Sequence, residues 1–400
     1  MRISKTEIAY FAALLLLLLL VFALNGIAGS TITSPQNLAT DLSSPLDSPQ
    51  DWSVQDWAVV KYRALFRWIV RGTWSAFFAP TDAAAFYAVF VSWSFLFFFC
   101  TLVAFYLYLK ALEFDPRTSF VGCLLFLASP PVLLAYKYPV YTREDPLAYL
   151  LVVVGLYAAF RSRLWLVGLI SAAGALTRET TLILPLSYFL SADEPWRKRV
   201  LVWVLPVLAF VGIRIVWGLV VGDSFASSVL NFQTPGETVA FLFCVFGVLW
   251  LPYLSGLVDR WQAGVFPNHA WKVLTSSGPI VFVLVMVATL TIARAREIRI
   301  SFLLFPWAIP FALDWFRTRS GYFLARVRKL DYWALSFSIL AFLAVLTIYL
   351  DFAHRDLMTR YLADFRNGYW LFIGVVHLSA TLAIVLPMLR RRRLDALASR

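Results

Sequence analysis

The sequence predicts an all-α protein, a polytopic bundle of transmembrane helices. Of its 400 residues, 61% are hydrophobic and only 14% are charged, and the mean hydropathy is +0.75. Soluble domains are about 45–50% apolar and 25% charged. Long apolar runs recur between short charged loops, and each run is read as a membrane-spanning helix because a helix satisfies its own backbone polar groups in lipid.

The expected spans follow these runs along the chain. The first has a basic start, the second follows a polar outer loop at 29–82, and the fourth begins at a Pro and ends at two arginines. With one re-entrant segment, about 10–11 spans are expected. The apolar runs cover residues 8–28, 83–112, 119–136, 146–160, 164–190, 201–221, 239–257, 279–293, 301–316, 333–350 and 369–389.

The basic residues indicate orientation and location. The net charge is +12, and Lys and Arg gather in short loops, as the positive-inside rule requires of cytoplasmic loops. We therefore expect a multi-pass protein of the plasma membrane with a cytoplasmic N-terminus, an uncleaved first span and a cytoplasmic tail at 390–393. No basic soluble domain is present to bind nucleic acid. The three cysteines lie in apolar runs and are read as packing residues.

The segment 164–190 carries Arg178 and Glu179 near its centre. Both flanks are basic, and each half is too short to cross about 30 Å of hydrocarbon at 1.5 Å per residue. A re-entrant helical hairpin with these two residues at its tip fits both facts. The alternatives are one tilted helix, or a full crossing at 164–190 with 301–316 re-entrant instead. The sequence leaves the choice open.

A basic amphipathic helix is expected at 57–71 in the first outer loop. At 100° per residue, Arg63, Arg67 and Arg71 form one stripe, and Trp57, Leu65, Trp68 and Ile69 lie opposite. Such a helix is typical of a membrane surface. It would contact an anionic lipid phosphate through its arginines, or serve only as an anchor.

Several ionisable residues are candidates for a functional site. Asp145 lies just before Pro146 at a span start, a position that also suits a helix cap. Charged side chains such as Arg178 and Glu179 are costly inside a membrane and therefore indicate a functional role. The Arg214 side chain, in contrast, is expected to extend to the membrane–water interface. Motifs of soluble enzymes are absent, and with three His a His-rich metal site is excluded.

These features together resemble the bacterial polytopic membrane glycosyltransferases of the C-type (GT-C) superfamily. The resemblance rests on the YRAL sequence at Tyr62–Leu65, the Asp145-Pro146-Leu147 span start, and the LTRET turn at Leu176–Thr180 with Pro185 after it. The resemblance covers roughly residues 5–200. We therefore expect a GT-C-like module at residues 1–200. Residues 201–400 add further helices, the outer loop 351–368 and the basic tail, within one membrane domain.

The resemblance implies an activity and a set of site residues. The family transfers a sugar from a polyprenyl-phosphate donor to an acceptor on the extracytoplasmic face. It implies that Asp56 or Asp51 acts as base, with Asp145 and Glu179 as further carboxylates, and that Arg63, Arg178 or Arg360 holds the donor phosphate. No metal ligand is assigned, and whether a divalent metal takes part stays open. The implied partners are membrane lipids, the polyprenyl-phosphate sugar and a glycan, lipid or protein acceptor.

Two other functions remain open from the sequence. The chain departs from the family pattern because no acidic pair directly follows the first span, where Asn25 and Gly26 stand. This departure favours a catalytically inactive scaffold. Broken helices and intramembrane charges are also features of transporters and flippases of lipid-linked or anionic substrates.

Overall fold

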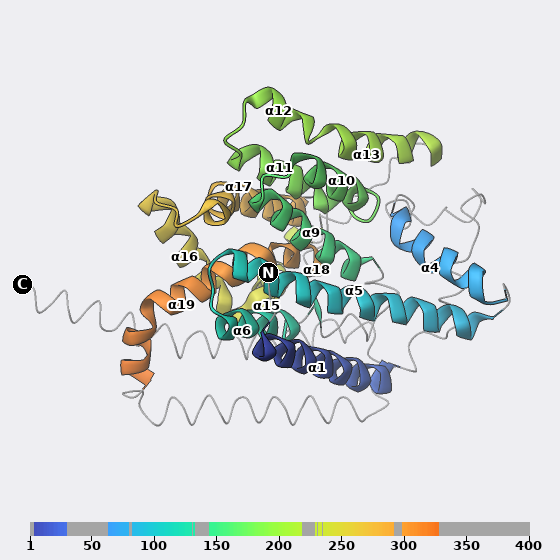
Figure 1. The fold of residues 1–400 in the computed structure, drawn as a ribbon, viewed down its shortest axis with the longest axis horizontal. Coiled ribbons are helices and arrows are strands. Elements are labelled where there is room, and N and C mark those ends of the chain that lie inside the picture. The colour runs from blue at the N-terminus through green and yellow to red at the C-terminus, as the bar shows by residue number, and fades with distance from the viewer. Residues whose placement is uncertain are drawn as a thin grey trace, which may run out of the picture.

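The computed structural model is all-helical in the residues that it describes (Figure 1). The predicted spans at 333–350 and 369–389, and the site candidates Asp51, Asp56 and Arg360, lie outside these residues. The described residues are 4–29, 63–79, 82–129, 131–132, 144–217, 229, 231–233, 235–291 and 298–327.

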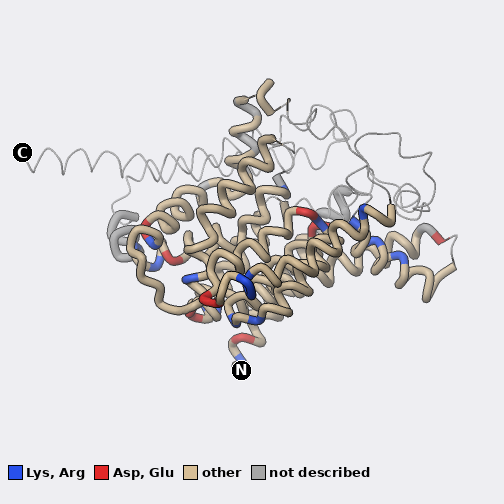
Figure 2. Tube along the Cα trace, turned by 90° about the horizontal axis from the view of Figure 1, so that it is seen from above, with Lys and Arg blue, Asp and Glu red and all other residues tan. Residues whose placement is uncertain are grey.

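Four described helices are long and apolar enough to cross a membrane, which supports the predicted membrane class. They are Lys5–Ala23, Ala84–Ala111, Trp196–Trp217 and His269–Thr291. Figure 2 shows long stretches of tube without charged residues between the coloured positions. Three shorter apolar helices accompany them: Pro116–Leu127, Asp145–Phe160 and Leu164–Ala175.

The first helices pack as antiparallel neighbours. α1 (Lys5–Gly29) begins with a capping box in which Ser4 and Glu7 each accept a hydrogen bond from the other's backbone N–H. Glu7 also lies 3.6 Å from Lys110 at the end of α5 (Ala83–Ala111). The chain then turns into α6 (Pro116–Leu127), which Asp115 caps by accepting from two backbone N–H groups.

Segment 164–190 folds as two short helices that turn back on each other. α9 (Asp145–Phe160) leads into α10 (Leu164–Ala175), and a 3-10 turn, η3 (Glu179–Leu182), joins α10 to α11 (Ile183–Ser191). Ser162 before α10 lies 3.2 Å from His269, and Asp193 after α11 forms an ion pair with Lys272. Both ends of the segment therefore lie at the first turn of one helix.

That helix is α17 (His269–Thr291), and its start defines one end of the bundle. Trp271 donates to the carbonyl of Leu112 beyond the end of α5. We call the end formed by Glu7, Lys110, Ser162, Asp193 and His269 the basal end. The predicted span 279–293 begins too late, because Pro279 lies inside α17 rather than at its start. Beside this proline, a Cβ at Gly278 would lie 3.0 Å from Leu257 and 3.4 Å from Trp307, so the neighbouring helices pack closely at this point of α17.

The remaining helices complete the bundle. α12 (Trp196–Leu201) packs on α11, and α13 (Val204–Trp217) packs on α10. The predicted span 239–257 is interrupted: α15 (Pro235–Phe246) ends at the 3-10 turn η4 (Gly247–Leu249) before α16 (Trp250–Ala263) begins. After α18 (Ile298–Ser301) and η5 (Phe302–Leu304), α19 (Phe305–Val327) packs along α16.

One arginine of the basic stripe predicted at 57–71 is buried in the structure, although the stripe was expected to contact lipid. α4 (Ala64–Phe77) buries Phe66, Val70 and Trp74 against aromatic residues of α5. Arg67 lies on this face and is 6% exposed, whereas Trp68 is 45% exposed. The expectation was wrong at Arg67 because the packing of three large apolar side chains at i, i+4 and i+8 fixes the rotation of α4. Residues 57–62 lie outside the described chain.

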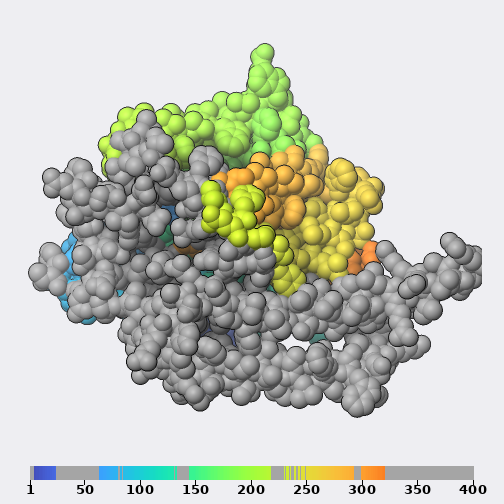
Figure 3. All heavy atoms as spheres, turned by 180° about the vertical axis from the view of Figure 1, so that it is seen from behind, coloured from blue at the N-terminus to red at the C-terminus, as the bar shows by residue number. Residues whose placement is uncertain are grey.

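One continuous core joins the two halves of the chain. Its buried members run from Leu14 in α1 to Leu313 in α19. Phe105 packs edge-on against Phe305 from the second half, and the Phe126 ring packs against Phe305 at a tilt. Figure 3 shows the green, yellow and orange segments of the later helices as adjoining surfaces. The helices that hold the polar residues described next are therefore fixed by a common aromatic core.

Candidate functional site

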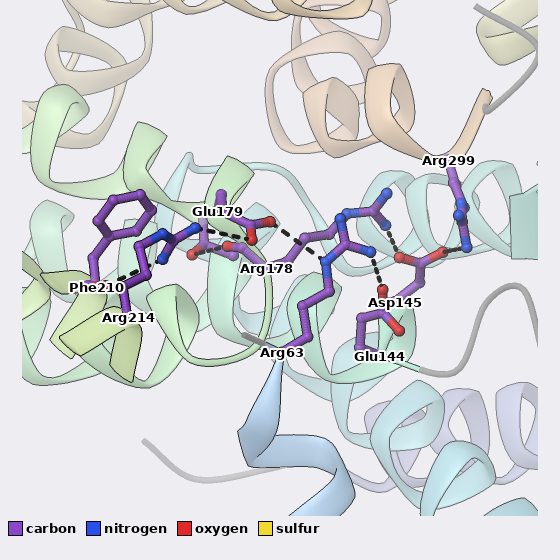
Figure 4. Close-up of polar contacts among 9 residues, drawn as sticks. Arg63, Glu144, Asp145, Arg178, Glu179, Phe210, Arg214 and Arg299 are labelled. Carbon is purple, nitrogen blue, oxygen red and sulfur yellow. Dashed lines mark hydrogen bonds and ion pairs between the residues drawn. The ribbon is translucent and has the colours of Figure 1, made fainter. Parts of the chain in front are cut away.

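Seven ionisable side chains from five separate segments lie together in two neighbouring sets of ion pairs (Figure 4). They lie before α4, at the start of α9, between α10 and α11, in the last turn of α13 and in α18, and thus away from the basal end. We call this set the charge cluster. Its members are Arg63, Glu144, Asp145, Arg178, Glu179, Arg214 and Arg299.

The innermost pair joins Arg178 to Asp145. The two side chains are in ion-pair contact, and each is 1% exposed. Arg299 lies 3.8 Å from the other Asp145 oxygen and is 18% exposed. A buried charge is costly unless it is paired. Asp145 therefore ties the start of α9 to the α10–α11 turn and to α18, and substrate does not reach this pair in the described conformation.

The outer part of the charge cluster surrounds Glu179. Arg63 forms an ion pair with Glu144, and its Nε lies 3.4 Å from Glu179 Oε2. Arg214 Nη2 lies 3.5 Å from Glu179 Oε1. The Glu179 side chain is 25% exposed, compared with 4% for Glu144 and 1% for Asp145. Glu179 is thus the most accessible carboxylate of the charge cluster, and it lies between two guanidinium groups.

Arg214 is held in place by its own helix. Its Nη1 donates to the carbonyl oxygen of Phe210 at 3.1 Å, and the guanidinium lies 3.5 Å from the centre of the Phe210 ring. A cation over an aromatic face is attracted by the ring quadrupole. The side chain therefore points back along α13 toward Glu179.

Arg178 and Glu179 lie in a tight turn, and their side chains contact different partners. Thr181 donates from both its N–H and its Oγ1 to the Arg178 carbonyl, at 3.0 and 2.8 Å. Gly174 makes this turn possible, because a Cβ there would lie 2.4 Å from Thr181 Oγ1. The backbone N–H of Leu65 donates to the Leu176 carbonyl at 3.0 Å, so the start of α4 is joined to the same turn.

The structure brings together four of the seven site residues named from the sequence: Arg63, Asp145, Arg178 and Glu179. The catalytic and phosphate-binding roles implied for them stay predictions. No site role was expected for Glu144 or Arg299, and Arg214 was expected to reach to the interface. Arg214 carried a usable signal, since an ionisable residue inside an apolar run is a site candidate. Glu144 and Arg299 carried none.

Within the described residues, no group of three or more His, Cys, Asp or Glu side chains is arranged to hold a metal ion. The cationic groups of the charge cluster are all arginines, which suit phosphate and carboxylate oxygens through paired N–H donors. Neither protein-family models nor curated proteins match this sequence.

Proposed function

We propose that this protein is an integral membrane glycosyltransferase that moves a sugar from a polyprenyl-phosphate donor to an acceptor on the extracytoplasmic face. One observation carries the proposal. The residues that resemble GT-C motifs, which lie far apart in the sequence, meet in two neighbouring sets of ion pairs away from the basal end. A purely packing role would not require an accessible carboxylate between two arginines.

We assign the catalytic and donor-binding roles to the outer residues of the charge cluster. Arg63 and Arg214 hold the donor phosphate through their guanidinium groups. Glu179 accepts the proton of the acceptor hydroxyl, and the oxygen of that hydroxyl attacks the anomeric carbon. The bond from the anomeric carbon to the phosphate oxygen breaks at the same time. The polyprenyl monophosphate leaves with the electron pair, and the arginines stabilise its added charge. Attack opposite the leaving group inverts the anomeric carbon.

We expect transfer to depend on Glu179. Purified protein in nanodiscs would be given a panel of polyprenyl-phosphate hexoses and pentoses with native membrane extract as acceptor source, and release of polyprenyl monophosphate measured. Glu179→Gln should lower the rate about a hundred-fold or more, the usual contribution of a general base.

Glu113→Gln is the matched control for this experiment. Glu113 is an exposed carboxyl in the turn after α5, near the basal end, and its change should leave the rate unaltered. Full activity of Glu179→Gln would contradict the assigned role. An inert wild-type protein that still binds polyprenyl phosphate would favour the inactive scaffold instead.

The membrane arrangement that this function needs is a re-entrant α10–α11 hairpin. α10 and α11 contain 12 and 9 residues, about 18 and 14 Å of helix, and each is too short to cross about 30 Å of hydrocarbon. The position of the charge cluster along α5 follows from Phe66, which lies three residues after Arg63 and packs on Phe97 of α5. Phe97 lies thirteen positions before Lys110, which is at the basal end (110 − 97). The charge cluster would then lie about 20 Å from the basal end, in a cavity open to the extracytoplasmic side.

Cysteine accessibility tests this topology. In a background without Cys100, Cys123 and Cys244, single cysteines at Ser162 and Glu194 should react with an impermeant maleimide only from the cytoplasmic side. A cysteine at Ala79, after α4, should react only from outside. Labelling of positions 162 and 194 from opposite sides would establish a full crossing and refute the hairpin.

A further inference from the structure

Glu179 places its two carboxylate oxygens as two oxygens of a phosphate group would lie. Oε2 faces Arg63 and Oε1 faces Arg214, so one small anion bridges guanidinium groups from opposite sides. Charged N–H···O bonds are normally about 2.7–2.9 Å long. The distances here, 3.4 and 3.5 Å, indicate two weak contacts that a better-fitting anion can replace.

Both arginines keep other supports when Glu179 moves away. Arg63 stays paired with Glu144, which is 4% exposed. Arg214 stays against the ring and the carbonyl of Phe210. The exposed fraction of Glu179 gives its side chain room to turn outward. The two guanidinium groups are therefore preorganised for an anion independently of the carboxylate between them.

We propose that Glu179 is an internal competitor for phosphate at Arg63 and Arg214, displaced when a phosphate-bearing ligand binds. The proposal rests on the function proposed above and adds an order of events to it. Phosphate binding takes the two arginines from Glu179, and the carboxylate is released to meet the acceptor hydroxyl. The base thus becomes available only when the donor is in place, which protects the site from acting on an acceptor alone.

Competition predicts an unusual result for a site carboxylate. Glu179→Gln should bind phosphate more tightly than wild type, because the neutral amide no longer competes for the arginines. Exposed ion pairs are individually weak, and the loss of two corresponds to about ten-fold in affinity. A carboxylate with a structural role alone would give unchanged or weaker binding.

The experiment is an equilibrium titration of the full-length protein in neutral phosphatidylcholine nanodiscs. A fluorescent short-chain polyprenyl monophosphate is one probe, and inorganic phosphate as a competitor is the second. Tighter binding by Glu179→Gln in the lipid arm alone identifies the lipid headgroup as the ligand, and the same change in both arms identifies phosphate itself. Glu113→Gln should match wild type, and Arg63→Gln and Arg214→Gln should lose binding about ten-fold or more.

Two results would overturn the proposal, and they differ in what else they affect. Equal or weaker binding by Glu179→Gln, with loss in the arginine variants, removes the competition and leaves the phosphate site intact. No binding by any form removes both the competition and the proposed function. If Glu179→Gln fails to fold, Glu179→Asp replaces it, because the shorter side chain retracts from both arginines and should bind phosphate with affinity between wild type and ten-fold tighter.

Discussion

Arg178→Met is expected to lower the free energy of unfolding by about 3–5 kcal/mol, the usual cost of breaking a buried ion pair. The change leaves the Asp145 carboxylate, 1% exposed, without its closest cation. Arg299 lies farther away, at 3.8 Å, and compensates only in part. Thermal and denaturant unfolding in a fixed detergent, followed by tryptophan fluorescence, measures the loss.

A double-mutant cycle separates the ion pair from the packing of the long side chain. Asp145→Asn alone should also destabilise, since it leaves a buried guanidinium. The Arg178→Met/Asp145→Asn protein should lose less than the sum of the two single changes, because it leaves neither charge alone. Additive losses would show that the pair contributes no coupling energy. Single variants as stable as wild type would contradict the burial of both groups.

Gly256→Ala is expected to separate α16 from α19. A Cβ at this position would lie 2.6 Å from the Phe311 carbonyl oxygen and 3.2 Å from its carbon, both backbone atoms of α19. Backbone atoms cannot turn aside as a side-chain end can. Overpacking of this kind costs about 1–3 kcal/mol and sometimes more, so we expect a clear fall in the midpoint of thermal unfolding.

Gly212→Ala is the matched control for that change. Gly212 lies within α13, and a Cβ there would meet no atom within 4 Å. Alanine favours a helix over glycine by about 1 kcal/mol, so this variant should be as stable as wild type or slightly more so. Equal losses in the two variants would show that a change of glycine itself, rather than the contact between α16 and α19, controls stability.

Helix interiors were predictable from the sequence, whereas prolines marked helix starts inconsistently: α9 begins beside Pro146 as expected, but α17 does not begin at Pro279. The apolar runs correctly located α1, α5, α9 and α13, because in lipid a chain satisfies its own backbone only as a helix. Pro279 indicated a helix start, yet α17 passes through it. Whether a proline interrupts a helix depends on neighbours that accept the distortion, and these come from elsewhere in the chain.

The candidate site shows the same division between local and distant information. Arg178 and Glu179 were recognisable as site candidates because a charged residue inside an apolar run is energetically costly. Their partners were not, since Asp145, Arg63 and Arg214 lie 33, 115 and 35 positions from the nearer of these two residues (178 − 145, 178 − 63, 214 − 179). The resemblance implied a catalytic role for Glu179 and a phosphate-binding role for Arg178, and the structure shows that the ion pairs of Glu179 are to Arg63 and Arg214.

The sequence by itself determined that this protein is a helical bundle with the composition of a membrane protein and that a short turn carries two charges. Hydropathy and periodicity are local properties, and they do not depend on which other segments a helix packs against. Only the tertiary structure decided that Arg178 is buried on Asp145 and that Glu179 lies between two arginines. The partner of a charge is decided by which helices meet, and their meeting follows from side-chain packing across the whole chain.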